Sequence, residues 1–407
     1  MESLNLELLT AASAAGGPSC LSSTTHLRPA AGPHASVAPA KFAVRGRDGG
    51  AYAYEKRFLD GRLRHTVVID SKQSQLNRAE AALVQGIEDG DELLTRVPRI
   101  LVRYAEGDTY LDLTLPHRAF DGHIRAGTLD GTPTTQTDAY RALRDAGPAN
   151  ARALLEASPA TLIFGGWDSS RRSRQGRWRS ALVGEITGFL AGDGMTDQRP
   201  EAALRGGARV DPVGMQIQVD GPTLRSLTED QRAEMSPKTV DGLLKEAGKL
   251  QKPGQVVSAS ALGLGGIPPT LESLAGVACD QIIRSHVLSF ATLRQMRFGA
   301  GPEGDAACRA LLAALALTGL ARSDAELYLR ANCDLVEAGP SSVQVDRRHG
   351  ELADLEPLDV GSAETLLADA LKQAERMADV RWNGVVLDVV GNPAIRGGAV
   401  EVEDEAG

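Results

Sequence analysis

The sequence predicts an α+β protein in which an antiparallel sheet is covered by helices on one side and is interrupted by insertions. Three observations support this class. Strand and helix patterns are mixed without the steady alternation of a doubly wound sheet, pairs of strand patterns joined by turns are frequent, and no repeat of fixed length is visible. With 407 residues, 42% hydrophobic and 24% charged, the chain can bury a sizeable core.

The first half of the chain contains the clearest patterns. Between Arg62 and Asp70, polar and apolar residues alternate, which is typical of a half-buried strand. From Ser71 to Ile87 the spacing of apolar residues becomes helical, and Asn77 with Glu80 resembles a capping pair. The further expected elements are a hairpin of 99–104 with 109–115, short helices at 138–146 and 150–157, a strand at 161–164 and a return strand at 181–189.

The second half combines loop-like segments with a few strong patterns. Residues 222–252 are polar and helical in pieces, so we interpret them as an insertion. Asp305–Leu320 is a strongly apolar helix, and Ser362–Met377 is an amphipathic helix. The remaining expectations are a loop at 195–207, a glycine-proline hinge at 263–269, a strand or helix within 276–298, a hairpin of 333–337 with 342–346 and a last strand at 385–390.

These elements divide the chain into three parts. Residues 1–40 form a short N-terminal helix and then a flexible stretch, from 11 to 40, that is rich in Ala, Ser, Gly and Pro. We therefore expect order to begin near Lys41. The expected folded domain is 41–395, with a basic-loop region at about 116–215 and the helical insertion at 222–252, and an acidic tail follows at 396–407.

Bulk composition indicates a cytoplasmic protein. No apolar run approaches the roughly 20 residues of a membrane span. The first ten residues carry two Glu and no basic residue, unlike a secretory signal. The net charge of −9 argues against indiscriminate coating of DNA. Four widely spaced cysteines fit reduced thiols better than a disulfide framework or a zinc site: Cys20, Cys279, Cys308 and Cys333.

The strongest functional signal is a basic loop that follows an apolar run and the pair Gly165-Gly166. From Asp168 to Ser180 there are five Arg and one Asp, a local charge of +4. Guanidinium groups form forked bonds to phosphate, and indole rings offer stacking platforms for bases. The pattern favours RNA or DNA over a solvated loop or an acidic protein partner. The residues concerned are Trp167, Arg171, Arg172, Arg174, Arg177, Trp178 and Arg179.

A second candidate lies where the strand at 62–70 ends and the helix begins. Exposed backbone N–H groups at a helix start, together with polar side chains, suit contacts with phosphate or sugar. Taken alone, this segment is equally explained by ordinary helix capping. The side chains that could supply such contacts are Lys72, Gln73, Asn77 and Arg78.

A third candidate is the segment from His117 to His123. Its two histidines and Asp121 match no common zinc or iron spacing, so we expect no metal there. Arg118 is expected to have a structural or an RNA-contacting role.

Several of these pieces occur together, in this order, in one known family. They are SKQSQLNRAE at 71–80, PHRAFD at 116–121, SPATLIFGGWDS at 158–169, RVDP at 209–212 and GGIPP at 265–269. On these residues, the chain resembles the RAMP-type backbone subunits, in the Cas-seven group, of type I-G CRISPR surveillance complexes, formerly called type I-U. The resemblance runs from about residue 40 to 300, and more loosely to 390. At Gly266 the family pattern has an Asn.

The resemblance implies a modified RRM-like, or ferredoxin-like, fold with inserted thumb and finger segments. It also implies that several copies bind along a CRISPR guide RNA, hold it for pairing with target DNA and contact other subunits of a type I-G complex. Such subunits are generally structural rather than nucleolytic, so the resemblance implies no catalytic residue, no cofactor and no membrane partner.

We therefore expect a non-catalytic subunit that reads RNA by its backbone and shape. The arginines of the loop would neutralise phosphates, Lys72, Asn77 and Arg78 would fix the backbone, and Trp167 would stack on a base. One alternative is a metal-dependent endoribonuclease of the type III backbone kind, with Asp168 or Asp121 as the acid. Another is a protein-only adaptor whose arginine loop docks on an acidic partner.

Overall fold

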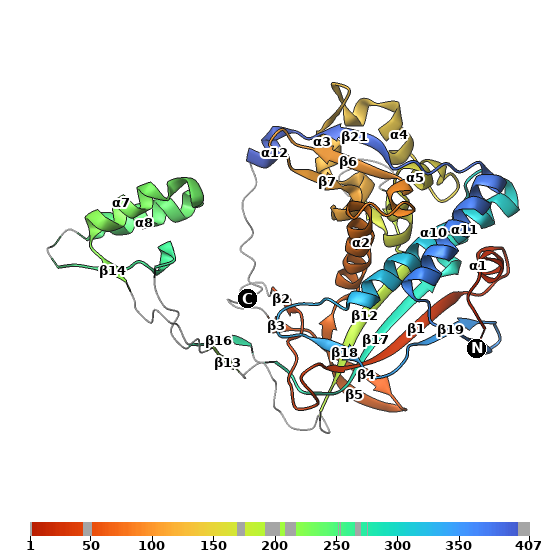
Figure 1. Cartoon of the computed structure of the whole chain (residues 1–407), viewed down its shortest axis with the longest axis horizontal. Coiled ribbons are helices and arrows are strands. Elements are labelled where there is room, and N and C mark those ends of the chain that lie inside the picture. The colour runs from red at the N-terminus through yellow and green to blue at the C-terminus, as the bar shows by residue number, and fades with distance from the viewer. Residues whose placement is uncertain are drawn as a thin grey trace. The chain divides into compact units, whose positions relative to one another are not determined.

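The chain folds into two compact units, and each is described separately. The larger unit comprises Met1–Asp197 and Gly276–Gly407, and the smaller comprises Gln198–Ala275 (Figure 1). The computed structural model describes residues 2–43, 51–168, 176–191, 204–207, 217–250, 252, 254–264, 270–274 and 276–397.

The described part of the larger unit is built on an eight-stranded sheet whose pairings are all antiparallel. The strand order is β20-β19-β1-β17-β12-β5-β4, and β18 pairs with the same edge of β1 as β19. The strands are β1 (Cys20–Pro29), β4 (Tyr54–Leu59), β5 (Arg62–Asp70), β12 (Leu182–Leu190), β17 (Cys279–Ser289), β18 (Leu335–Glu337), β19 (Ser342–Asp346) and β20 (Leu352–Leu355).

Four of these strands and two helices follow the split β-α-β order of ferredoxin-like folds. In the chain they run β1, α2 (Lys72–Glu88), β12, β17, α10 (Gly301–Glu326), β19. In the sheet they lie β19-β1-β17-β12, so the fourth strand neighbours the first and the third lies between the first and second. The hairpin β4–β5 extends the sheet beyond β12. The predicted α+β class with a central antiparallel sheet is confirmed.

The helices pack on the sheet through an alanine-rich core. Every residue of α10 from Gly304 to Ala321 is buried, and α11 (Val360–Ala378) lies along it (Figure 1). Among the described helices, α10 alone is long and apolar enough to cross a membrane, but its apolar stretch is wholly buried inside the protein. Small side chains let α1 (Leu6–Ser13), α2 and α11 approach α10 closely. At Gly319, an added Cβ would lie 3.1 Å from the Ala79 carbonyl oxygen of α2.

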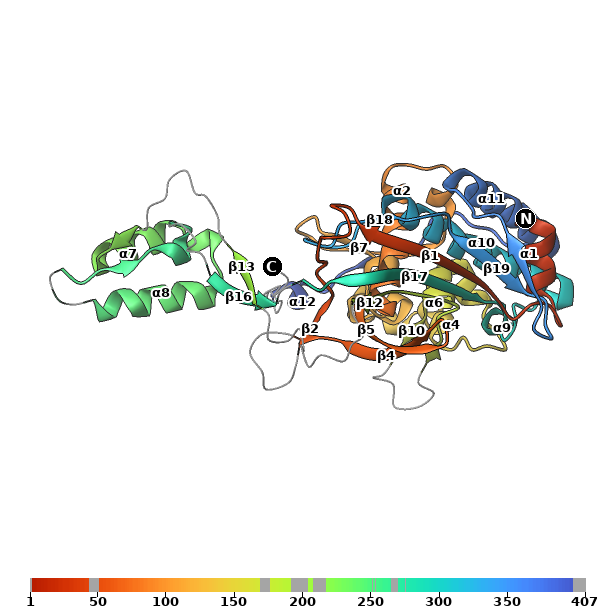
Figure 2. The ribbon, with the colours of Figure 1, turned by 90° about the horizontal axis from the view of Figure 1, so that it is seen from below.

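A second, five-stranded sheet has the order β7-β6-β21-β8-β9. Its strands β6 and β7 form the predicted hairpin, while β21 pairs in parallel with β6. Figure 2 gives a second view of the unit. The bounds are β6 (Arg99–Arg103), β7 (Thr109–Leu111), β8 (Thr128–Leu129), β9 (Thr132–Pro133) and β21 (Val385–Val390).

Short helices and strands complete the larger unit. They are β2 (Lys41–Phe42), β3 (Ala51–Tyr52), α3 (Gly122–Ala126), α4 (Asp138–Arg144), α5 (Arg152–Ala157), α6 (Pro159–Phe164), β10 (Gly166–Trp167), β11 (Arg177–Trp178), α9 (Phe290–Leu293) and α12 (Pro393–Gly397).

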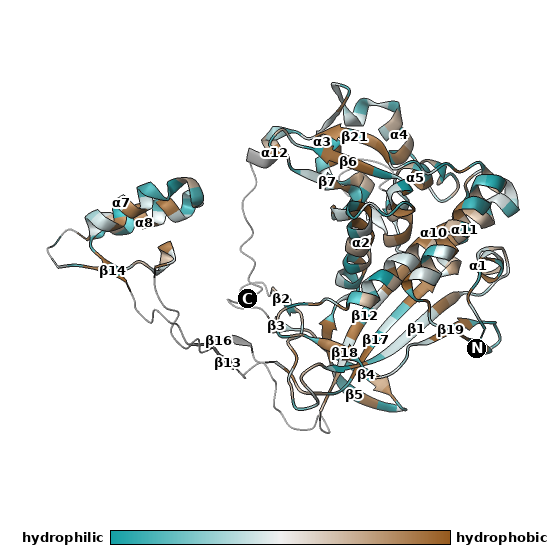
Figure 3. Cartoon of the chain, in the orientation of Figure 1, coloured by the Kyte–Doolittle hydropathy of each residue, from teal (hydrophilic) through white to brown (hydrophobic). Residues whose placement is uncertain are grey.

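The smaller unit contains the predicted helical insertion. Its helices α7 (Gly221–Asp230) and α8 (Pro237–Lys249) begin at capping residues Asp220 and Ser236 and pack against each other. Both helices are mostly hydrophilic, with a few hydrophobic residues (Figure 3). Their small core contains Leu224, Leu243, Ala247 and Leu262. The short strand pairs are β14 (Gln218–Val219) with β15 (Val257–Ser258), and β13 (Leu204–Gly207) with β16 (Thr270–Leu274).

The expected flexible stretch at 11–40 is wrong, because this segment contains the central strand β1. Leu21, Ser23, Thr25 and Leu27 are buried, and the residues between them are more exposed. The composition, rich in Ser and Thr, concealed this alternation. Hydroxyl side chains are buried here because partners exist far along the chain: the Thr25 and Ser341 hydroxyl oxygens lie 2.7 Å apart.

One expected element and one expected strand pairing are also wrong. Residues 161–164 belong to α6 rather than to a strand, since a short apolar run that is buried throughout fits either element. The segments at 333–337 and 342–346 do not pair with each other. Both run antiparallel to β1, so the chain keeps its direction between them. The strand expected at 181–189 is confirmed as β12, which pairs with β17 and β5.

Buried polar groups link the sheet to the helices. His286 of β17 is buried, and its Nε2 lies 3.1 Å from Oε1 of Gln75 in α2. Burial, with Arg284 nearby, lowers the pKa of His286 to about 3, so the ring is neutral at physiological pH. The Arg284 guanidinium, 1% exposed, pairs with Asp324 of α10 at 3.2 Å and with Glu337 at 2.7 Å. These contacts fix the position of both helices on the sheet.

The packing around His286 predicts that Gly184→Ala destabilises the protein. A Cβ at Gly184 would lie 2.1 Å from Cδ2 of His286 and would displace the ring from Gln75. Overpacking of this kind lowers the free energy of unfolding by about 1–3 kcal/mol. Chemical denaturation measures the loss. The control is Gly361→Ala in α11, where the Cβ meets Asp359 Oδ1 at an ordinary 3.7 Å. Equal stabilities of the two variants would contradict the packing argument.

Candidate nucleic-acid interface

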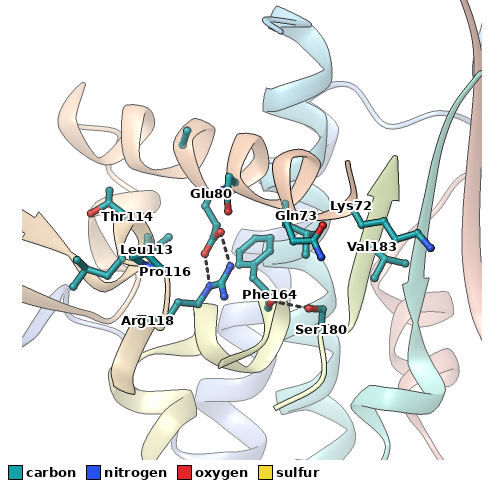
Figure 4. A pocket seen from close by; sticks show the side chains of 14 residues that line it. Lys72, Gln73, Glu80, Leu113, Thr114, Pro116, Arg118, Phe164, Ser180 and Val183 are labelled. Carbon is teal, nitrogen blue, oxygen red and sulfur yellow. Dashed lines mark hydrogen bonds and ion pairs between the residues drawn. The ribbon is translucent and has the colours of Figure 1, made fainter. Parts of the chain in front are cut away.

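A groove of about 680 Å³ opens beside the N-terminal half of α2 (Figure 4). We call it the polar groove. One wall is α2, the second is the segment 113–118, and the third is formed where α6 and β12 approach each other. Its lining residues are Lys72, Gln73, Leu76, Asn77, Glu80, Ala81, Leu113, Thr114, Leu115, Pro116, Arg118, Phe164, Ser180 and Val183.

The first turn of α2 presents polar groups along this groove. Ser71 caps the helix by accepting a hydrogen bond from Ser74 N at 3.3 Å, in place of the predicted pair of Asn77 with Glu80. Lys72, Gln73 and Asn77 are exposed. The Lys72 side chain extends away from Glu80 (Figure 4). The positive end of a 17-residue helix, with the exposed ammonium of Lys72 beside it, favours an anion.

A buried carboxylate, Asp70, positions this helix end. It accepts hydrogen bonds from the Ser74 hydroxyl at 2.9 Å, Gln75 Nε2 at 2.6 Å and Arg78 Nε at 2.9 Å, and it also pairs with Arg330. Burial alone would raise the pKa of Asp70, but these hydrogen bonds and the two arginines lower it. Asp70 is therefore ionised at physiological pH.

The same contacts remove Arg78 from the predicted RNA-binding set. Its guanidinium bonds to Asp70 and donates to the Tyr328 carbonyl oxygen at 2.5 Å. A buried carboxylate that lost this partner would be left under-compensated, which is costly. Arg78 therefore has a structural role at the base of α2, while Lys72, Gln73 and Asn77 stay open to a ligand.

Arg118 also points inward, so the expected RNA-contacting role gives way to the structural one. Its guanidinium forms a bidentate pair with Glu80, at 2.5 and 2.7 Å (Figure 4). It also donates to the Gly165 carbonyl oxygen at 2.8 Å. It also lies 5.8 Å from the ring centroid of Phe164. Burial raises the pKa of Glu80, and the ion pair with Arg118 opposes this rise. Arg118 thus ties α2 to the turn that precedes the basic loop.

The basic loop begins and ends in the short hairpin β10–β11. Gly165 has φ +89°, a left-handed conformation that suits glycine, and an added Cβ would lie 2.9 Å from the Trp178 carbonyl oxygen. Trp167 is 49% exposed, with the Arg177 guanidinium 5.9 Å from its ring centroid. His117 meets the same ring edge-on at 6.5 Å. Trp167 is available as a stacking platform.

The other tryptophan is not available. Trp178 is 8% exposed and belongs to the hydrophobic core, so the stacking role predicted for it is wrong. Adjacent strand residues point to opposite faces, so Arg177 and Trp178 cannot both face outward. Arg177 and Arg179 are exposed. Arg171, Arg172 and Arg174 lie outside the described residues.

The two candidate acids of the nuclease alternative are both buried. Asp168 is 2% exposed, and its Oδ1 accepts a bond from Arg125 at 3.3 Å. Asp121 caps α3 by accepting from His123 N at 3.0 Å, and it also accepts from His117 N at 3.2 Å. Within the described residues, no group of three His, Cys, Asp or Glu side chains is placed to hold a metal ion.

Sequence reasoning missed the apolar wall of the groove. Leu113 and Leu115 fall within the strand expected at 109–115 and Pro116 follows it, but residues 112–114 form a 3₁₀ turn after β7. Asp112 holds this turn, accepting bonds from Ile100 N at 3.1 Å and from the Ser158 hydroxyl. Residues 111–115 read Leu-Asp-Leu-Thr-Leu, an alternation typical of a strand, so the local sequence carried no signal of the turn.

Comparison with protein families places this groove inside a matched region. Residues 21–192 match the family model of the CRISPR-associated protein GSU0053, and all the residues that line the polar groove lie within this span. The match indicates a CRISPR-associated protein family. No curated protein matches the chain significantly.

The buried Asp112 predicts a pH-dependent stability that Asp112→Asn removes. Burial raises the pKa of Asp112 to about 7, although the hydrogen bond from Ser158 opposes the rise. The folded state keeps this proton up to about pH 7, while the unfolded chain releases it near pH 4. The contribution of Asp112 to stability is therefore complete below about pH 4 and is lost as the pH rises to 7.

Denaturation of both proteins at several pH values measures this effect. The stability of the wild type relative to Asp112→Asn should fall by up to about 1.4 kcal/mol per pH unit inside that window and stay level above it. Asp138→Asn is the control, because the Asp138 side chain is fully exposed. A relative stability that is independent of pH would show that Asp112 is already ionised in the fold.

Proposed function

We propose that this chain is a non-catalytic, cytoplasmic, guide-RNA-binding backbone subunit of a CRISPR surveillance complex of the type I-G kind. Several copies would follow one guide RNA and present it for pairing with target DNA. One observation carries the proposal: the chain enters the arginine-rich segment after Phe164 and leaves it before Ser180, and both residues line the polar groove with Lys72, Gln73 and Asn77.

The groove has the chemistry of a site for one stretch of a nucleic-acid backbone. Its polar edge carries the helix start and Lys72, which suit phosphate. Its apolar wall, formed by Leu113, Leu115, Pro116 and Phe164, suits a sugar or the face of a base. Backbone contacts of this type position a strand without reading its sequence, so the base edges remain free to pair.

The exposed hairpin residues add to this surface. Trp167 offers an aromatic face, and Arg177 lies beside it. Arg179 precedes Ser180 at the groove. A protein of net charge −9 that concentrates arginines at one groove fits a polyanion held at a defined place.

The competing functions have less support. An endoribonuclease using Asp168 or Asp121 would need a carboxylate that reaches the substrate, and these two are buried and bonded within the protein. A protein-only adaptor would account for the arginines but not for the adjoining helix start and apolar wall.

Two single substitutions test the groove. We expect Lys72→Glu to weaken RNA binding about tenfold or more, because it places a negative charge at the phosphate position. Trp167→Ala should cost about 1–3 kcal/mol per stacked base. Fluorescence anisotropy with a labelled single-stranded RNA measures both. Lys372→Glu on α11 is the matched charge control, and the Lys372 side chain is 73% exposed. If Lys72→Glu and Trp167→Ala both bind RNA as the Lys372→Glu control does, the groove does not hold RNA.

Replacement of the five loop arginines by alanine tests the electrostatic contribution of the basic loop to RNA binding. For a single strand, each phosphate contact contributes about 0.7 to the slope of log K against log salt concentration. The variant should therefore lose affinity for unrelated RNA sequences alike and show a slope flatter by up to about 3.5. The residues are Arg171, Arg172, Arg174, Arg177 and Arg179. Unchanged affinity and slope would reject the role of the loop.

The nuclease alternative is tested with purified protein, labelled RNA and Mg²⁺. We expect intact RNA after prolonged incubation. Cleavage at regular intervals that Asp168→Ala abolishes would establish the enzyme and overturn the structural role.

A further inference from the structure

The polar groove contains a hydroxyl group whose proton is already used inside the protein. The Ser180 hydroxyl donates to the Phe164 carbonyl oxygen at 2.7 Å (Figure 4). A serine hydroxyl has one proton to donate and two lone pairs that accept. Because the proton is bonded to Phe164, the oxygen of Ser180 meets a ligand in the groove as a hydrogen-bond acceptor.

The backbone around Ser180 fixes the position of this oxygen. The next residue, Ala181, donates its N–H to the Ile163 carbonyl oxygen at 2.7 Å, so the chain is held against the end of α6. A Cβ at Gly165 would lie 2.9 Å from Ser180 Oγ, and the glycine therefore leaves room for the hydroxyl. Ser180 is half-buried. A ligand that covers this oxygen without donating a proton to it leaves an acceptor unsatisfied, which weakens binding.

Other polar side chains of the groove select less strictly for a donor. The Lys72 ammonium only donates, so it suits a phosphate oxygen. The amide groups of Gln73 and Asn77 both donate and accept, so they fit a phosphate or a hydroxyl equally. The Thr114 hydroxyl donates to the Leu111 carbonyl oxygen at 2.8 Å, but Thr114 is exposed, so water can satisfy its oxygen beside a bound ligand. Ser180 therefore favours a ligand that donates a proton at this place.

The backbone of a nucleic acid carries such a donor only when it is RNA. Phosphate oxygens and the ring oxygen of the sugar accept hydrogen bonds, whereas the ribose 2′-hydroxyl donates, and deoxyribose lacks it. Within one nucleotide, the 2′-hydroxyl and the 3′-phosphate are attached to neighbouring carbons of the sugar. A phosphate held beside Lys72 therefore brings a sugar into the groove that Ser180 and the apolar wall line.

We propose that Ser180 Oγ accepts a hydrogen bond from a ribose 2′-hydroxyl and thereby makes the polar groove selective for RNA over DNA. The inference deepens the proposed function and rests on it, because the phosphate contacts place the sugar. Phosphates are identical in a guide RNA and in its DNA target, so a groove that reads no base can distinguish the two strands only by their sugars or by the shape that the sugars impose. Ser180 is thus a specificity residue for the kind of sugar.

The ligand side of the contact is tested with the wild-type chain and three single strands of one base sequence. They are RNA, the same RNA with fluorine in place of every 2′-hydroxyl, and DNA made with deoxyuridine. Fluorine keeps a ribose-like sugar pucker but cannot donate a hydrogen bond. By fluorescence anisotropy at one salt concentration, RNA should bind about three- to tenfold more tightly than the fluorinated strand, which is the range expected for one hydrogen bond. DNA should bind no more tightly than the fluorinated strand.

The protein side is tested with Ser180→Ala, which removes the acceptor. The ratio of RNA affinity to fluorinated-RNA affinity should fall to about one, because RNA then loses the contact that the fluorinated strand never made. Thr365→Ala is the matched control: the Thr365 hydroxyl also donates to a backbone carbonyl, that of Gly361 at 2.9 Å, but it lies on α11 outside the groove. This control should keep the wild-type ratio. If Ser180→Ala is unstable, Ser180→Cys keeps a side chain of similar size with a weak acceptor and should give the same result.

The inference and the proposed function fail by different results. If the wild type binds RNA and the fluorinated strand equally, the groove does not recognise the 2′-hydroxyl, while RNA binding itself stands. If Ser180→Ala keeps the ratio of Thr365→Ala, or loses affinity for all three strands in the same proportion, Ser180 has only a structural role. If the wild type binds none of the strands, the proposed function fails and the inference fails with it.

Discussion

The arrangement of the functional surfaces depends on one buried carboxylate. Asp70 ends β5, is fully buried and binds three side chains of α2 and Arg330. Through Gln75 the network continues to His286 on β17. The negative charge of the buried Asp70 must stay paired with its hydrogen-bond donors and with Arg330. The start of α2 and the segment after α10, which supply these partners, are therefore held in fixed positions. Each of these two elements forms a wall of a groove.

The protein uses its arginines in two distinct ways. Arg78, Arg118, Arg284 and Arg309 bond inside the protein, where each satisfies a carboxylate or a carbonyl oxygen of a distant segment. Arg177 and Arg179 are exposed. The guanidinium group suits both uses, since it is always charged and donates up to five hydrogen bonds. Local composition therefore indicates a cationic segment without saying which of its members face a ligand.

Helix α2 separates two grooves. The polar groove is lined by α2 residues between 72 and 81, a second groove towards the end of α10 is lined by residues between 74 and 89, and Asn77 and Ala81 contribute to both. Because the two grooves share these residues, the position of one helix determines where both of them lie. A helix fastened to the sheet at Asp70 and tied to the basic loop through Glu80 and Arg118 provides that constraint.

Patterns along the chain were enough to predict the α+β class, the helices expected at 71–87 and 362–377, the helical insertion and the polar groups at the start of α2. These follow from periodicity, which is a property of neighbouring residues. Contacts between distant parts of the chain make β1 a central strand, engage Arg78 and Arg118 within the protein and bury Trp178. The physical reason is that burial of a polar or aromatic group depends on its partner. Glu80 is 38 residues from Arg118 and Tyr328 is 250 residues from Arg78, so no local pattern contains that information.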